Sequence, residues 1–203
     1  MFVKICGLQT TADVAAAVAS GADAIGFVFA ESVRRVTPEQ AAELCAGVSN
    51  DIIRVAVMLH PTPREWKDVQ TVFKPDWLQT DLQDFDGLDI GTDTVPLPVL
   101  RDHESIDSSL LQAHNRLLFE GKRSGQGATA DWGLAAAAAA QTSIVLAGGL
   151  DADNVAQAIK NVMPWGVDVS SGVEDAPGRK SAAKIAAFIK AAREAENRTD
   201  GKN

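Results

Sequence analysis

Short apolar segments alternate with helix-like segments along the whole chain, and this alternation limits the folds that it can adopt. Eight segments have the length of strands, and most lack a polar–apolar alternation, as is typical of parallel strands covered on both faces. They are Val3–Cys6, Ala24–Phe29, Arg54–Met58, Trp77–Gln79, Leu97–Leu100, Arg116–Glu120, Ile144–Ala147 and Gly166–Val169. Such a chain predicts an α/β protein, either a closed barrel or an open doubly wound sheet.

The intervening segments carry helix start signals. Thr37 and Thr62 each precede a proline and stand three residues before a glutamine or glutamate, which is the pattern of a capping box. Further start signals stand at Thr10 or Thr11, Asp151 and Ser181. The region Leu82–Pro96 is rich in Asp and Gly, so we expect at most a short helix there.

The chain is expected to form a single domain over residues 1–203, with the polar residues 197–203 as a disordered tail. No linker rich in proline, glycine or serine divides it. The first strand is followed by Cys6-Gly7-Leu8 and not by G-x-G-x-x-G, which disfavours a dinucleotide fold. We therefore favour a single (β/α)8 TIM barrel, compact and with short loops because the chain is short for this fold.

Charge and composition exclude several classes of partner. With 46% hydrophobic and 23% charged residues the chain is globular, and its net charge of −8 disfavours binding to nucleic acid or to an anionic membrane. No segment approaches the roughly 18 apolar residues of a membrane span. Two cysteines and no signal peptide indicate a cytoplasmic protein. No metal-ligand spacing relates the three histidines, His60, His103 and His114.

Two consecutive predicted strands near the C-terminus end in turns of small residues. Ile144–Ala147 runs into Gly148-Gly149, and Gly166–Val169 runs into Ser170-Ser171-Gly172. Turns after strands seven and eight form the phosphate site of many (β/α)8 barrels. One such turn would be unremarkable, but two in succession favour a phosphate ligand over ordinary connections.

Two reactive side chains stand at predicted strand ends, where barrel residues point into the active site. Cys6 could act as a base once deprotonated, although a buried cysteine more often fills space. Glu120 could act as an acid; the alternative is a surface residue paired with Lys122 or Arg123.

Charged residues near the strand ends could bind a substrate. Arg34 or Arg35 could bind a carboxylate through a bidentate pair. Asp168 could reach the site; the alternative is that it orients a turn.

Five motifs in this order span nearly the whole chain: Lys4-Ile5-Cys6-Gly7-Leu8, Gly21–Phe29, Arg34-Arg35-Val36-Thr37-Pro38, Leu146–Leu150 with Asn154-Val155, and Gly166–Glu174 with Pro177-Gly178. Together they resemble the phosphoribosylanthranilate isomerase family. The resemblance implies a (β/α)8 barrel that performs an Amadori rearrangement in tryptophan biosynthesis, without metal or cofactor. The substrate would be N-(5-phosphoribosyl)anthranilate and the product 1-(2-carboxyphenylamino)-1-deoxyribulose 5-phosphate.

The resemblance also implies roles for individual residues. Cys6 would be the general base that removes the C2 proton of the sugar, and Glu120 the general acid that opens the furanose ring. Arg34 would hold the anthranilate carboxylate, with Gln79 and Asp168 as further substrate contacts. The phosphate would be bound by Gly127, Gly148, Gly149, Ser171 and Gly172. The small-molecule substrate would be the main partner, and the protein a monomer or homodimer.

The chain departs from the family pattern at three places. The usual acid is aspartate, whereas Glu120 carries one more methylene, and a misplacement on that scale can cost roughly 100-fold in rate. The usual strand-four motif Val-Gln-Leu-His-Gly is replaced by Leu78-Gln79-Thr80-Asp81-Leu82. The usual Val-Gly-Val-Phe of strand three is replaced by Val55-Ala56-Val57-Met58.

Three other functions compete with this interpretation. The sister isomerase of histidine biosynthesis shares the phosphate turns but has aspartate in place of Cys6. A non-catalytic phosphosugar-binding barrel would explain the changes at Glu120, Thr80 and Asp81, but not the retention of Cys6. An aldolase would need a Schiff-base lysine, for which Lys4 is the only and a poor candidate.

Overall fold

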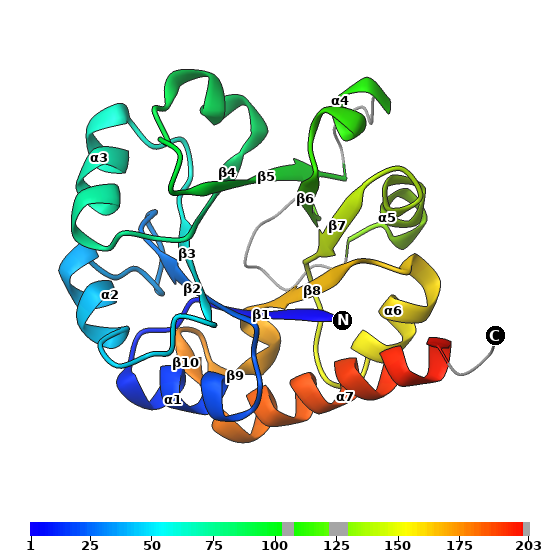
Figure 1. Cartoon of the computed structure of the whole chain (residues 1–203). Helices are drawn as coiled ribbons and strands as arrows, with labels where there is room; N and C mark the ends of the chain where they lie inside the picture. The colour runs from blue at the N-terminus through cyan, green and yellow to red at the C-terminus, as the bar shows by residue number, and fades with distance from the viewer. Residues whose placement is uncertain (103–107, 122–129, 201–203) are drawn as a thin grey trace.

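A computed structural model describes residues 1–102, 108–121 and 130–200 of the chain. Eight parallel strands form a closed barrel in the order of the sequence, with helices around the outside (Figure 1). The strands are β1 (Phe2–Cys6), β2 (Ala24–Val28), β3 (Ile53–Val57), β4 (Trp77–Asp81), β5 (Val95–Arg101), β6 (Arg116–Glu120), β7 (Ser143–Leu146) and β8 (Gly166–Val169). The prediction of a TIM barrel is confirmed, and the open sheet is excluded because β1 pairs with β8.

Helices connect successive strands and pack against the outer face of the barrel. They are α1 (Thr11–Ala19), α2 (Pro38–Leu44), α3 (Pro63–Val72), α4 (Ser108–Ala113), α5 (Trp132–Ala139), α6 (Val155–Val162) and α7 (Ala182–Asp200). Two 3-10 helices, η1 (Leu82–Gly87) and η2 (Ser171–Val173), follow β4 and β8. Helix α7 extends into the expected tail as far as Asp200, and residues 201–203 lie outside the described part.

The threonine caps form as the sequence predicts, and Asp151 makes similar bonds just before α6. Thr10, Thr37 and Thr62 each complete a capping box with the residue three positions later. Asp151, expected to cap α6, accepts hydrogen bonds from the N–H groups of Asp153 and Asn154, both at 2.9 Å, which is the bonding pattern of an N-cap. With the bond from the N–H of Val155 to the carbonyl oxygen of Asp151, they form a turn that leads into the helix, which begins at Val155.

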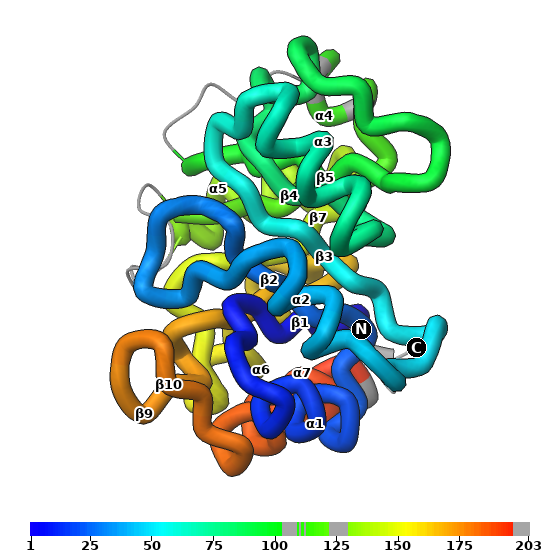
Figure 2. The backbone as a smooth tube through the Cα atoms, turned by 90° about the vertical axis from the view of Figure 1, so that its left-hand side faces the viewer, coloured from blue at the N-terminus to red at the C-terminus, as the bar shows by residue number. Residues whose placement is uncertain are grey.

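A short antiparallel hairpin follows the eighth strand. Its strands, β9 (Glu174–Ala176) and β10 (Arg179–Lys180), lie between η2 and α7. In Figure 2 the hairpin projects on the left, on the side of the molecule away from the N-terminus.

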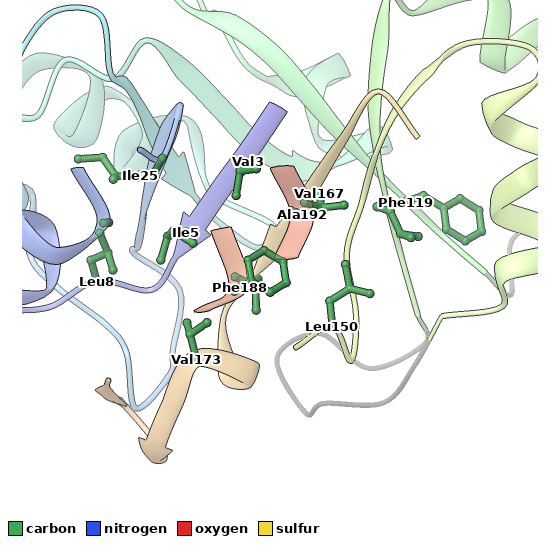
Figure 3. Packing of buried hydrophobic residues seen from close by; sticks show 14 of the residues in the cluster. Val3, Ile5, Leu8, Ile25, Phe119, Leu150, Val167, Val173, Phe188 and Ala192 are labelled. Atoms are coloured by element: carbon green, nitrogen blue, oxygen red, sulfur yellow. The ribbon is translucent and has the colours of Figure 1, made fainter. Parts of the chain in front are cut away.

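Alternate residues of each strand enter two separate cores. Residues such as Val3, Ile5 and Phe119 face outward toward the helices, and α7, which carries Phe188, contacts β1 (Figure 3). The inner core consists of Phe2, Ala24, Val55, Trp77, Leu97, Val99, Leu118, Val145 and Ala147. This period of two decides which strand residues can reach the inside of the barrel.

Aromatic rings fill the end of the barrel where the strands begin. The ring of Phe2 stacks on Trp77 and on Trp165, with centroids 5.4 and 4.5 Å apart. The guanidinium of Arg116 lies over Trp165, 3.6 Å from its centroid, and 4.9 Å from that of Trp77. Stacked rings therefore occupy this end of the barrel, while the candidate reactive groups lie toward the opposite end. Among the described residues, no helix is long and apolar enough to span a membrane.

Candidate active site

Three charged or reactive side chains meet inside the barrel beneath the open ends of β1 and β8. Lys4, Cys6 and Asp168 all face inward, and each is at least nine-tenths buried. The ammonium of Lys4 donates to Oδ1 of Asp168 at 2.9 Å. The prediction that Lys4 shares the inward face with Cys6 is confirmed.

The absence of a side chain at Gly26 leaves the space in which this group lies. A Cβ atom at that position would lie 3.0 Å from Sγ of Cys6 and 3.2 Å from Nζ of Lys4. Both approaches are closer than ordinary carbon contacts, so a side chain on β2 would require the thiol and the ammonium to shift by a few tenths of an ångström.

Burial and neighbouring charges act in opposite directions on the thiol. Burial raises the pKa of Cys6, while the ammonium groups of Lys4 and Lys180 lower it in part and Asp168 raises it further. Burial alone would lower the pKa of Lys4, but Asp168 and Cys6 outweigh it and the pKa is raised. Lys4 therefore stays protonated and favours the thiolate of Cys6.

Arg34 reaches the end of β1 from the loop after β2. Its Nε and Nη2 donate to the two carboxylate oxygens of Glu174 at 2.7 and 2.8 Å. Its stem crosses Gly7, where a Cβ would lie 2.6 Å from Cδ of the arginine. Gly7 has a φ of 75°, which also favours glycine.

The neighbouring Arg35 lies elsewhere. It is exposed and lines a separate pocket of about 680 Å³, formed by the loops after β2 and β3 and by parts of α2 and α3. Of the two arginines, only Arg34 therefore approaches the residues at the mouth.

The two turns predicted to bind phosphate lie against each other. A Cβ at Gly172 would lie 1.9 Å from the carbonyl oxygen of Leu150, so this contact requires glycine. Gly148 and Gly149 both have positive φ, and within the described chain their N–H groups donate to no other residue. The side chain of Asn154 donates to the carbonyl oxygen of Gly149 at 2.8 Å and fixes this turn.

Glu120 shares a small pocket with both turns. The lining of this pocket also includes Asp168, Gly148, Gly149 and Ser171. The end of β6 thus brings the candidate acid to the same mouth as the anion-binding turns. Gly127, also predicted to bind phosphate, lies outside the described residues.

Arg101, which the sequence interpretation did not include in the site, lies between Glu120 and Asp81, a second residue that it did not include. Nη2 of Arg101 lies 2.6 Å from Oδ1 of Asp81, and its Nη1 lies 3.5 Å from Oε2 of Glu120. Strands β4 and β5 end at these residues, beyond their predicted ends at Gln79 and Leu100. The alternation of inward-facing and outward-facing residues along β4 and β5 could have predicted that Asp81 and Arg101 point into the barrel.

Gln79 faces the inside of the barrel from β4 and is buried. Its Oε1 has no hydrogen-bond partner in the described part of the chain, so it can accept a further hydrogen bond. No group of three or more metal-ligating side chains occurs among the described residues.

A sequence model of N-(5'-phosphoribosyl)anthranilate isomerase matches residues 3–191 of this chain. The chain belongs to this family. It is 39% identical to the isomerase of Geobacter sulfurreducens, with 94% of this chain and 98% of that protein covered. It is 42% identical to that of Streptococcus mutans, with 92% and 96% covered.

Solved structures of this isomerase family have the same fold. The structure from Thermus thermophilus superimposes with a TM-score of 0.86 at 28% identity, over 96% of this chain and 99% of the other. A family structure in complex with reduced 1-(o-carboxyphenylamino)-1-deoxyribulose 5-phosphate gives a TM-score of 0.79 at 31% identity, with the same shares covered.

Proposed function

We propose that this isomerase converts N-(5'-phosphoribosyl)anthranilate to 1-(2-carboxyphenylamino)-1-deoxyribulose 5-phosphate with Glu120 as general acid and Cys6 as general base. The observation that carries the proposal is the arrangement of the mouth. A carboxyl group and the two glycine turns line one pocket, and a thiol flanked by ammonium groups lies next to it.

Ring opening is the first step. The carboxyl group of Glu120 donates its proton to the furanose oxygen, and the bond between this oxygen and C1 breaks. The lone pair of the anthranilate nitrogen forms a C=N bond to C1, which leaves a cationic imine and the carboxylate of Glu120. A positioned acid is needed because an alkoxide is a poor leaving group.

Proton removal from C2 is the second step. The thiolate of Cys6 takes this proton, and the electrons of the C–H bond form the C1–C2 double bond of an enolamine as the imine nitrogen regains its lone pair. Tautomerisation then gives the ketone product. Lys4 assists because its ammonium favours the thiolate against the effect of burial.

The remaining residues bind the two anionic ends of the substrate. The N–H groups of Gly148, Gly149, Ser171 and Gly172 bind the phosphate, since backbone donors in such turns favour an anion. Arg34 binds the anthranilate carboxylate, while Gln79 and Asp168 contact the middle of the substrate. The reaction takes place in the cytoplasm, and the protein is a monomer or a homodimer; one solved relative from Thermotoga maritima is described as a dimeric enzyme converted to monomers.

Turnover by single variants tests the two catalytic roles. We expect Cys6→Ala and Glu120→Gln each to lower kcat by about 100-fold or more with N-(5'-phosphoribosyl)anthranilate, because each removes one proton-transfer group. Cys45→Ala is the matched control, since this second cysteine lies at the end of α2 and should leave kcat unchanged. Rates close to that of the parent in both catalytic variants would exclude the mechanism.

The histidine-pathway substrate can be compared in the same assay. The histidine-pathway isomerase has an aspartate at the position of Cys6. We therefore expect this chain to turn over that isomerase's substrate little or not at all. Equal turnover of both substrates would point to a dual-substrate enzyme.

A further inference from the structure

Within the described part of the site, the carboxylate of Glu174 accepts the most hydrogen bonds, yet Glu174 has no role in the proton transfers of the reaction. Its side chain is only 4% exposed. It accepts hydrogen bonds from Nε and Nη2 of Arg34, from Nζ of Lys180 at 2.8 Å and from the N–H of Gly178 at 3.2 Å. Burial alone would raise the pKa of Glu174, but the bonds from Arg34 and Lys180 outweigh it and lower the pKa to about 2. Glu174 is therefore an anion at any physiological pH.

The pairing leaves part of the Arg34 guanidinium available. A guanidinium has five N–H donors in a rigid plane, and Glu174 uses one on Nε and one on Nη2. Three remain, two on Nη1 and one on Nη2, and within the described residues they donate to nothing. These two nitrogens form a second edge that can bind another carboxylate in bidentate geometry, so Glu174 fixes the plane of Arg34 without blocking it.

Lys180 connects the same carboxylate to the phosphate side of the site. Its ammonium is buried, with one bond to Glu174, one to the carbonyl oxygen of Ser170 at 2.9 Å and one to Oγ of Ser170 at 3.2 Å. These three bonds use all three of its protons. Ser170 directly precedes Ser171 and Gly172 of the phosphate turn, so the position of this turn depends on Lys180, and that of Lys180 on Glu174.

We propose that Glu174 is a positioning residue that couples the two ends of the substrate site: it orients Arg34 toward the substrate carboxylate and, through Lys180, holds the phosphate turn at Ser170. The identity of the two substrate groups rests on the proposed function. The hairpin of β9 and β10 supplies both Glu174 and Lys180.

The test compares substrate and phosphate binding in Glu174→Gln, which keeps the shape of the side chain but removes its charge. We expect KM for N-(5'-phosphoribosyl)anthranilate to rise about tenfold or more while kcat changes far less, because the lost contacts orient binding groups and not the reacting atoms. Affinity for inorganic phosphate, measured by calorimetry, should fall by about threefold or more in the same variant. In Arg34→Met the KM should rise, but the phosphate affinity should stay within about twofold, because the bond from Lys180 to Ser170 remains.

A control variant separates this role from a general loss of stability. Asp76→Asn breaks another bidentate pair, with Arg54, at the start of β4 and away from the mouth, so both binding constants should remain those of the parent. If Glu174→Gln does not fold, Glu174→Asp keeps the charge and shortens the reach, and it should weaken both ligands by a smaller factor.

Each outcome decides between the proposals. Unchanged KM and phosphate affinity in a folded Glu174 variant, or a change in only one of them, would overturn the coupling. A parent protein without turnover would overturn the proposed function instead. The calorimetric measurement needs no turnover, so it would still decide whether Glu174 organises the phosphate turn.

Discussion

The two ends of the barrel are built from the same strands but from opposite kinds of side chain. Where the strands begin, the rings of Phe2, Trp77 and Trp165 stack beneath the guanidinium of Arg116. Where the strands end, thiol, carboxylate and ammonium groups face the mouth. A strand such as β1 passes from Phe2 through Lys4 to Cys6 within five residues, so it changes from packing to chemistry along one inward face.

This difference separates stability from activity along the barrel axis. Apolar and aromatic packing at the closed end contributes free energy of folding without constraining the reaction. Burial of the ionic groups at the open end costs free energy of folding. These groups serve substrate binding and proton transfer rather than stability. Variants at the two ends should therefore fail in different assays, and the following four are ordered by expected effect.

The largest effect is expected at the closed end. Trp77→Ala removes a buried indole and leaves a cavity, so the free energy of unfolding should fall by about 3–5 kcal/mol. Urea denaturation measures this loss, and kcat/KM well below the melting temperature should stay within a few-fold of the parent. A large loss of kcat/KM in a fully folded variant would show that the two ends are not independent.

A variant midway along the barrel should affect both assays. Lys4→Met leaves Asp168 buried without its cation, which should cost about 3 kcal/mol of stability. It also removes the charge that favours the thiolate, so the pKa of Cys6 should rise. Because the base must be deprotonated, activity is lost as pH falls through this pKa, and a higher pKa moves the loss to higher pH.

A pH profile of kcat/KM measures this shift. The double variant Lys4→Met with Asp168→Asn is the control for stability, since it removes both charges and should recover much of the unfolding free energy. An unshifted profile in Lys4→Met would show that Lys4 does not tune the thiol.

The third variant probes the acid at the open end. Glu120→Asp restores the usual residue of the family but shortens the side chain by one methylene. The carboxyl group then lies farther from Arg101, which pairs with Glu120 and with Asp81. We expect kcat to fall by about 10- to 100-fold, because a shift of about 1 Å in a catalytic group has effects of this size. Stability should change little, and a gain in kcat would mean that the surroundings still suit aspartate.

The smallest effect is expected from Arg116→Met at the closed end. It removes a cation that lies over two indole rings but keeps most of the apolar volume, so it should change stability by about 1 kcal/mol. Thermal unfolding and kcat/KM can be measured on the same sample. A loss of activity without a loss of stability would contradict the separation of the two ends.

The fold could be predicted from the sequence because its signals are local. Apolar segments and capping threonines depend on a few neighbouring residues, and most strand positions differ from those predicted by one or two residues. The ends of two strands differ from the prediction: β4 and β5 continue to Asp81 and Arg101, where polar side chains interrupt the apolar pattern but keep the inward alternation. Sequence hydrophobicity alone therefore ended both strands too early.

The candidate site could be predicted only where a motif or a strand end marks it. Cys6, Glu120 and the glycine turns were found in this way. The pairing of Arg34 with Glu174 joins residues 140 positions apart, and that of Lys4 with Asp168 joins residues 164 apart. Both follow from closure of the barrel between β8 and β1, which no local pattern encodes.

The absence of a side chain at Gly26 has a practical consequence for the redesign of this enzyme. A mutant library restricted to side chains with functional groups would pass over it, because glycine offers no chemistry of its own. Yet a single methyl group there would intrude on the sulfur and on the amine beside it. Substrate range is therefore better altered from the opposite wall, and residue 26 is best left out of the randomised set.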